Sequence, residues 1–93
     1  MNELNHKWKI TDDNVAFYLF KCGSKLEIEF TAKKLGIKLS SLKMRVKNFA
    51  FLDTNKGLSN FSKQTESVFN SWKDSSKTEL KTEYEKIIST INI

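Results

Sequence analysis

Proline is absent from the 93-residue sequence, and glycine, cysteine and histidine are scarce, with three, one and one residues respectively. A single cysteine excludes an internal disulfide, and one histidine with one cysteine cannot build a zinc site of the usual kind. No run of about 18 apolar residues occurs, so the sequence predicts no membrane-spanning helix. A chain without proline and with so little glycine is typical of an all-helical protein with short turns.

The sequence is also poor in groups that perform chemistry. Two acidic pairs occur, Asp12 with Asp13 and Glu27 with Glu29, but neither is accompanied by a metal-ligating or basic partner. The three glycines are too scattered to form a phosphate-binding loop. We therefore expect no catalytic residue, no bound metal and no cofactor, which means that the protein is not an enzyme.

A length of 93 residues predicts a single domain over 1–93 and excludes folds that need roughly 200 residues or more, such as a TIM barrel. The segment Met1–Ile10 carries charged residues and no apolar stretch, so we do not expect it to act as a secretion signal. Because an unpaired cysteine fits a reducing compartment, we expect a cytoplasmic protein.

Hydrophobic spacing and capping residues predict about five helices and an all-α fold, winged-helix-like but without a clear wing. The helices are expected from a cap at Thr11 to Gly23, over about 26–35, from a cap at Ser40 or Ser41 to about Leu52, over about 62–72, and over about 76–91. We expect the core over 8–72.

Two of these helices need further comment. In the first, Val15, Leu19 and Cys22 recur at helical spacing and mark one apolar face, which Phe17, Tyr18 and Phe20 broaden. In the second, residues 27–31 alternate polar and apolar side chains as a strand does. The whole window through Leu35 fits a helix better, so we predict a helix there.

Charge is distributed unevenly along the chain, which has 16 basic and 11 acidic residues and a net charge of +5. Residues 1–57 hold 11 of the basic and 6 of the acidic residues, whereas residues 58–93 hold 5 of each. No acidic residue occurs between Phe30 and Leu52, a segment with several lysines and Arg45. Such a stretch is typical of a surface that binds a polyanion, usually nucleic acid, although a solvated lysine face gives the same pattern.

The second and third expected helices, joined by a four-residue turn that contains Gly36, match a helix-turn-helix unit. In such a unit the second helix turns its polar side to the major groove of DNA, while its apolar side, here Leu42, Val46 and Phe49, packs in the core. The residues expected on the DNA-facing side are Ser40, Ser41, Lys43, Met44, Lys47 and Asn48, and those expected at the phosphates are Lys33, Lys34 and Lys38.

For two other residues of this region, Asn48 and Arg45, the sequence leaves two roles open, and for Phe51 it suggests a role on single-stranded DNA. Asn48 could bond an adenine edge or be a structural residue near the helix end. Arg45 lies beside the core stripe and could clamp Asp53 instead of contacting DNA. Phe51, near the basic face, could stack on the bases of a single strand.

One part of the chain resembles a known module. Residues 41–53 read SLKMRVKNFAFLD, residues 56–63 read KGLSNFSK, and Val68 and Trp72 follow. Together with Trp8, Thr11, Asp12 and Asp13 these elements are similar to the small helical module at the N-terminus of many bacterial HNH endonucleases of the restriction type. The resemblance covers about residues 8–72 and implies a helix-turn-helix-like DNA-binding module.

The departures from that module affect what the resemblance implies. The catalytic HNH part is missing from the sequence, and Leu39–Ser40 stands where the module has a proline before its Ser-Val step. More weakly, the free-standing chain resembles the small accessory protein of the A-family DNA polymerase/primase of Gram-positive mobile cassette elements. That second resemblance implies a chain that binds the polymerase and enables priming.

The C-terminal segment carries Leu80, Tyr84, Ile87 and Ile91 at spacings of four, three and four residues, like a short coiled-coil seam. One interpretation packs this helix on the domain's own core. The other makes it a docking surface for a protein partner or a homodimer seam. On the second interpretation the partner-binding residues are Tyr84, Ile87, Ile88 and Ile91.

Taken together, these features predict a non-catalytic DNA-binding protein, an accessory subunit that recruits DNA to a larger DNA-processing enzyme such as a mobile-element polymerase/primase or a nuclease. The DNA could be single- or double-stranded, and no membrane contact is expected. A dimeric transcriptional regulator is one alternative. An inhibitor from a phage or mobile element that binds a host or defence protein is another.

Overall fold

The computed structural model describes residues 7–54 and 62–91, which form five α-helices and no strand. In chain order the helices are α1 (Ile10–Cys22), α2 (Lys25–Leu35), α3 (Leu39–Thr54), α4 (Lys63–Trp72) and α5 (Lys77–Ser89). The expectation of an all-α fold with about five helices is confirmed. The strand pattern over 27–31 lies inside α2, so the helical interpretation of that segment is correct.

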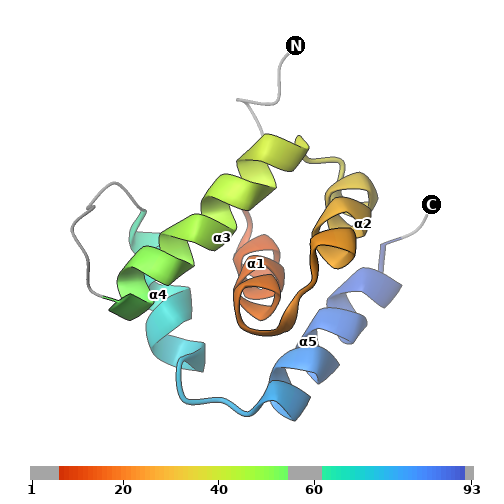
Figure 1. The fold of residues 1–93 in the computed structure, drawn as a ribbon. Helices are drawn as coiled ribbons and strands as arrows, with labels where there is room; N and C mark the ends of the chain where they lie inside the picture. The colour runs from red at the N-terminus through yellow and green to blue at the C-terminus, as the bar shows by residue number, and fades with distance from the viewer. Residues whose placement is uncertain (1–6, 55–61, 92–93) are drawn as a thin grey trace.

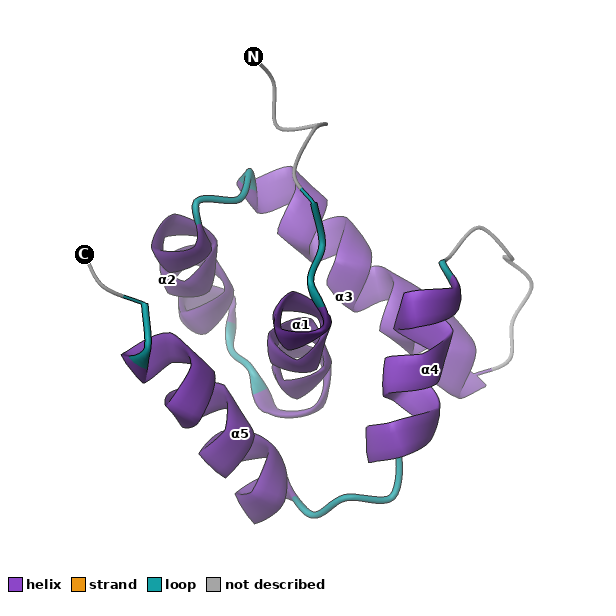
Figure 2. Ribbon diagram, turned by 180° about the vertical axis from the view of Figure 1, so that it is seen from behind, coloured by secondary structure: helices purple, strands orange, loops and turns teal. Residues whose placement is uncertain are grey.

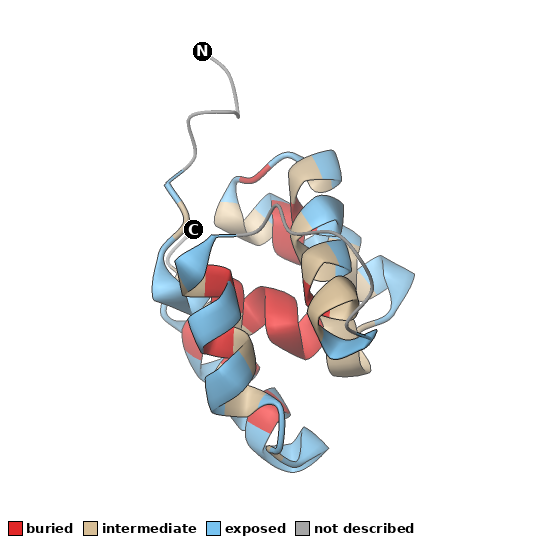
Figure 3. Cartoon of the chain, turned by 90° about the vertical axis from the view of Figure 1, so that its left-hand side faces the viewer, coloured by how far each residue is buried: buried red, intermediate tan, exposed pale blue. Residues whose placement is uncertain are grey.

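Helix α1 lies at the centre of the molecule, and the other four helices surround it (Figures 1 and 2). Its five consecutive residues Val15, Ala16, Phe17, Tyr18 and Leu19 are all buried, and Figure 3 shows this helix as the red centre of the fold. Ala16 adds to the broad apolar face that the sequence predicts, so this part of the helix is buried around its whole circumference, as a helix with neighbours on every side must be.

Phe17 is the aromatic centre of this core. Its ring makes edge-on contacts with Phe49 of α3 at 5.2 Å and with Phe69 of α4 at 6.0 Å between centroids, and a tilted contact with Phe20 at 5.8 Å. Such tilted arrangements bring the positive edge of one ring to the negative face of the next. Helices α1, α3 and α4 are therefore joined through one side chain.

Helix α5 completes the core from another side. Leu80, Tyr84 and Ile87 are buried, and the Tyr84 ring stacks on the Tyr18 ring of α1 with 4.3 Å between centroids. The Tyr84 hydroxyl shares a hydrogen bond of 2.8 Å with the Thr31 hydroxyl of α2. The core is therefore wider than the expected 8–72 and includes the last helix.

The helix ends follow local chemistry, with two corrections. The side chains of Ser24, Ser62 and Ser76 accept hydrogen bonds from the first-turn amides of α2, α4 and α5. Thr11 does not cap α1, because the helix already begins at Ile10 and the Asp12 carboxylate accepts from the Lys9 amide. Ser40 and Ser41 lie inside the first turn of α3, which begins at Leu39.

No helix within the described ranges is both long and apolar enough to cross a membrane.

Candidate nucleic-acid interface

The turn between α2 and α3, Gly36–Lys38, is fixed at both ends. Gly36 has φ = 70°, a left-handed conformation in which a Cβ atom is strained, and its amide closes α2 by donating to the carbonyl oxygens of Ala32 and Lys33. Ile37 is buried, and its amide donates to the Ala32 carbonyl oxygen. The two helices and the short turn that the sequence predicts are therefore present in the chain, with a turn one residue shorter than expected (Figure 1).

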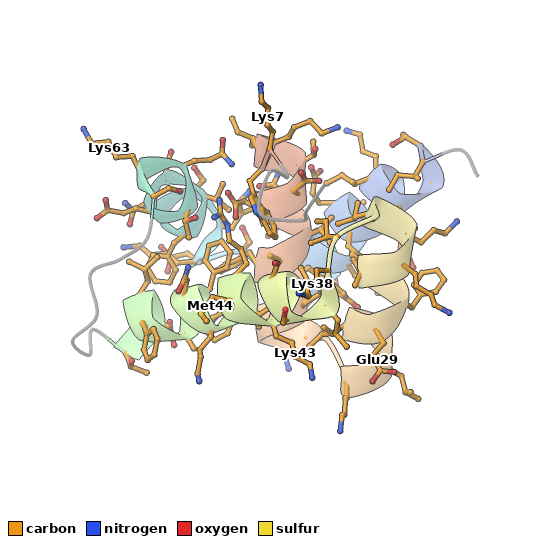
Figure 4. All side chains as sticks on the ribbon, turned by 90° about the horizontal axis from the view of Figure 1, so that it is seen from above. Lys7, Glu29, Lys38, Lys43, Met44 and Lys63 are labelled. Atoms are coloured by element: carbon orange, nitrogen blue, oxygen red, sulfur yellow. The ribbon has the colours of Figure 1, made fainter. Side chains whose placement is uncertain are left out.

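Helix α3 has an inner and an outer side. Leu42 and Phe49 are fully buried, whereas Lys43, Met44 and Lys47 are exposed, Met44 with 58% of its surface accessible. Figure 4 shows Lys43 pointing away from α4 and α5. We call the exposed residues Ser40, Lys43, Met44 and Lys47 the outer face of α3.

The lysines of this outer face carry uncompensated charge. Within residues 7–54 and 62–91, no ion pair or hydrogen bond reaches the ammonium groups of Lys43 and Lys47. The two residues are four positions apart, so they lie on the same side of the helix about one turn from each other. Two free cations at that separation suit adjacent phosphates of a nucleic acid.

The other sequence-predicted contact residues flank this face. Lys33 and Lys38 are exposed, and Lys34 is half-buried with its Nζ 5.9 Å from the centroid of the Phe30 ring. Ser41 and Asn48 are also half-buried. Burial at the side of α3 makes Asn48 less accessible to a base edge than Lys43 or Lys47.

One acidic residue lies near the basic surface. Glu29 of α2 is exposed, and in Figure 4 it points to the same side of the molecule as Lys43. Its carboxylate lowers the positive potential at that edge of the surface. Glu29 therefore provides a charge whose removal should strengthen the attraction of a polyanion.

Arg45 does not belong to the outer face. Its Nε and a terminal nitrogen donate to the two carboxylate oxygens of Asp13 at 2.6 and 2.9 Å, and its guanidinium lies 4.3 Å from the centroid of the Trp8 ring. Asp13 is fully buried. The predicted partner Asp53 was wrong, since the bidentate contact is with a carboxylate on α1.

Gln64 completes this polar cluster from α4. Its side-chain amide donates to Asp13 at 2.7 Å and to the Trp8 carbonyl oxygen at 2.9 Å. The cluster of Trp8, Asp13, Arg45 and Gln64 ties α3 and α4 to the start of α1. A buried carboxylate is stable only when it is paired and hydrogen-bonded, and here every partner comes from a different part of the chain.

Sequence reasoning missed Asp13 and Gln64 as members of one cluster. A signal was present, because Trp8, Asp13 and Arg45 all belong to the elements that resemble the HNH-associated module. The structure brings these three residues into contact, so part of that motif positions α3 and does not face the solvent.

The second site that the sequence predicts, the partner-binding surface of the last helix, lies in the core. Tyr84 and Ile87 are buried between α5, α1 and α2, and Ile88 and Ile91 are half-buried. The interpretation that packs this helix on the domain's own core is correct. Tyr84 and Ile87 are therefore not on the surface where a partner would contact them.

The described part of the chain contains no group of three or more histidine, cysteine, aspartate or glutamate side chains that could hold a metal ion. Comparison of the sequence and the fold with protein-family models, curated proteins and solved structures finds no significant match. The residues and their geometry are therefore the basis for a functional assignment.

Proposed function

We propose that this chain is a non-catalytic DNA-binding protein that uses α3 as its recognition helix and recruits DNA to a larger DNA-processing enzyme. The observation that carries the proposal is the pair Lys43 and Lys47, which are exposed on the second of two helices joined by a three-residue turn and have no ion pair within the described residues. The acid-free stretch 30–52 and the resemblance to the HNH-associated module support it.

The arrangement of charges suggests a division of roles on the DNA. Lys43 and Lys47 lie on the outer face of α3, where they would reach a groove wall or its phosphates. Lys38, in the turn between α2 and α3, would contact the backbone and fix the position of the protein without reading sequence. Arg45 takes no part, because its guanidinium is paired with Asp13.

The test is the double variant Lys43→Glu/Lys47→Glu, assayed by fluorescence anisotropy with a labelled duplex and with one of its single strands. At about 50 mM salt we expect a loss of affinity of about tenfold or more, since counterion release dominates at low salt. The slope of log affinity against log salt should fall by about 1.8 on duplex, or about 1.4 on a single strand, for two lost contacts.

A matched control separates a site from the net charge of the protein. Lys77 and Lys81 are exposed on α5 with the same four-residue spacing, so Lys77→Glu/Lys81→Glu changes the net charge equally at a distant place. The control should keep the wild-type slope, and Glu29→Gln should strengthen binding. Equal losses in both double variants would mean that no site exists on α3, and an unchanged affinity in the α3 variant would overturn the proposal.

A further inference from the structure

Helix α2 presents an apolar surface that the fold does not use. Leu26 and Phe30 are 76% and 49% exposed, and they lie four residues apart, so their side chains are neighbours on one side of the helix. The buried residues of α2 are Thr31 and Ala32, with Ile28 and Leu35 packed against the core. At about 100° per residue, Leu26 and Phe30 point away from that buried side.

These two side chains contribute nothing to the core, since neither belongs to the core cluster or to the residues packed against it. Single exposed apolar residues are ordinary on protein surfaces, but a leucine and a phenylalanine side by side form a continuous patch. Exposed aromatic and aliphatic side chains of this kind are the usual anchors of protein interfaces. The patch is therefore available for a partner.

The rim of the patch is basic. Lys25 and Lys33 are exposed, and the Lys34 Nζ lies 5.9 Å from the centroid of the Phe30 ring. Glu29 is the one acidic side chain among the exposed residues of α2. No ion pair within the described residues reaches these three lysines. The patch therefore carries a net positive charge, which negative groups on a partner would complement.

We propose that the outer side of α2, with Leu26 and Phe30 at its centre and Lys25, Lys33 and Lys34 at its rim, docks into an apolar groove edged by carboxylates on a partner protein. Charge decides between the possible occupants. A second copy would set three lysines against three lysines across a two-fold axis, and like charges at an interface are repulsive. A nucleic acid would satisfy the lysines but would leave the aliphatic Leu26 side chain without an apolar counterpart.

This docking site rests on the proposed function in one respect, because an accessory subunit must bind the larger enzyme to which it recruits DNA. It places the partner on α2 and not on α5, whose apolar residues are buried in the core. The DNA-facing residues of α3 and the apolar patch of α2 are different side chains, so their failures can be told apart.

The tagged full-length chain is expressed in the cells that naturally make it and is recovered with its bound proteins, once as wild type and once as Leu26→Gln/Phe30→Gln. Glutamine keeps the helix propensity of α2, and the exposed positions leave the core intact. The matched control is Ile10→Gln, which removes an exposed apolar side chain at the start of α1, away from both surfaces. Proteins retained by wild type and control but lost with the double variant are identified by mass spectrometry, purified, and titrated with the purified chain by calorimetry.

We expect one such protein, bound at least about tenfold more weakly by the double variant and more weakly by all variants as salt rises. Loss of a dimer in sedimentation equilibrium would instead assign the patch to a second copy. Loss of DNA affinity in the double variant would assign it to the nucleic-acid surface. Either result would overturn the inference, and so would the absence of any protein whose binding depends on Leu26 and Phe30. A loss of DNA binding that is confined to the Lys43/Lys47 variant would be consistent with it.

Discussion

Helices α3 and α5 both pack on α1, but they present different surfaces to solvent. The exposed residues of α3 from Ser40 to Lys47 include two lysines and no acid, whereas those of α5 mix three lysines with Glu79 and Glu85. A polyanion is attracted only where charge of one sign accumulates. The exposed lysines of α3 therefore form a surface of one charge sign that is available for binding, whereas the polar side of α5 is an ordinary solvated face.

The inner sides of the two helices also differ in how they are held. Helix α5 is attached by apolar and aromatic contacts of Leu80, Tyr84 and Ile87 and by neutral-donor hydrogen bonds, such as that between the Tyr84 and Thr31 hydroxyls, without an ion pair among the described residues. Helix α3 is attached by apolar residues and, in addition, by the ion pair of Arg45 with Asp13. A charged anchor fixes the rotation of a helix more narrowly than apolar packing does, because its hydrogen bonds are directional.

The most severe test of this comparison is Ile87→Asp. If α5 is part of the core, a carboxylate at this buried position loses the apolar contacts and must be desolvated, with an expected loss of about 4–5 kcal/mol in the free energy of unfolding. Urea unfolding followed by circular dichroism measures it. The control Met44→Asp, at an exposed position of α3, should change stability by about 0.5 kcal/mol or less. A stably folded Ile87→Asp variant would show that α5 is not a core element.

The next largest effect is expected for Arg45→Met. The substitution leaves the fully buried Asp13 carboxylate without its bidentate partner, and breaking a buried pair from one side costs about 3–5 kcal/mol. Chemical denaturation of this variant, compared with Lys43→Met two residues away, measures the difference between a paired and a free cation. Lys43→Met should lie within about 0.5 kcal/mol of wild type.

A double variant sharpens this result. In Asp13→Leu/Arg45→Met both charges are removed, so the double variant should be more stable than Arg45→Met alone. If Arg45→Met is as stable as Lys43→Met, then the ion pair does not hold α3. The distinction between the inner and outer cations of this helix would then be lost.

Local sequence signals predicted the parts of the fold that depend on neighbouring residues. Gly36 lies in the turn that the sequence predicts and ends α2 in a left-handed conformation, and Ser62, where the fourth helix was expected to begin, caps α4. The spacing of Leu42 and Phe49 correctly identified the inner side of α3. Each of these features is decided within about one or two helical turns, which is the range over which a pattern can be read.

Features that depend on distant residues were not predictable in the same way. Asp13 looks like a carboxylate that favours the start of a helix, yet it is buried because Arg45, 32 positions away, and Gln64, 51 positions away, supply its partners. The apolar run from Val15 to Phe20 indicates a broad buried face on α1, but nothing local identifies the helices that surround it. The exposure of Leu26 and Phe30 was equally hidden, since an apolar residue on a helix is expected to face the core.

A smaller effect is expected for Tyr84→Phe, which tests how α5 is joined to α2. The variant keeps the ring that stacks on Tyr18 but leaves the fully buried Thr31 hydroxyl without its 2.8 Å partner. An unsatisfied buried hydroxyl costs about 1–2 kcal/mol, measured by the shift of the urea midpoint at constant slope. In Thr31→Val/Tyr84→Phe both polar groups are gone, so part of the loss should be recovered. A neutral Tyr84→Phe would mean that this hydrogen bond does not hold the two helices together.

The smallest expected effect is a dependence of stability on alkaline pH, which the α5 side of the core should show because its contact with α1 is a pair of stacked phenols. Burial, with the nearby Glu27 carboxylate, raises the pKa of Tyr18 from 10.0 to about 12, and burial also raises the pKa of Tyr84. A phenol whose pKa is higher in the folded state keeps its proton there while the unfolded chain releases it. The resulting contribution to stability is complete below pH 10 and is lost as the pH rises from 10 to 12.

Tyr18→Phe isolates this contribution, because the two proteins differ only in the phenol hydroxyl group of residue 18. Between pH 9 and pH 11, the wild type should lose more of its free energy of unfolding than Tyr18→Phe does, as measured by urea unfolding at each pH. Parallel losses in the two proteins would show that the Tyr18 phenol titrates alike in the folded and unfolded chains. Of the two stacked phenols, Tyr84 alone would then set the attachment of α5 apart from that of α3 at alkaline pH.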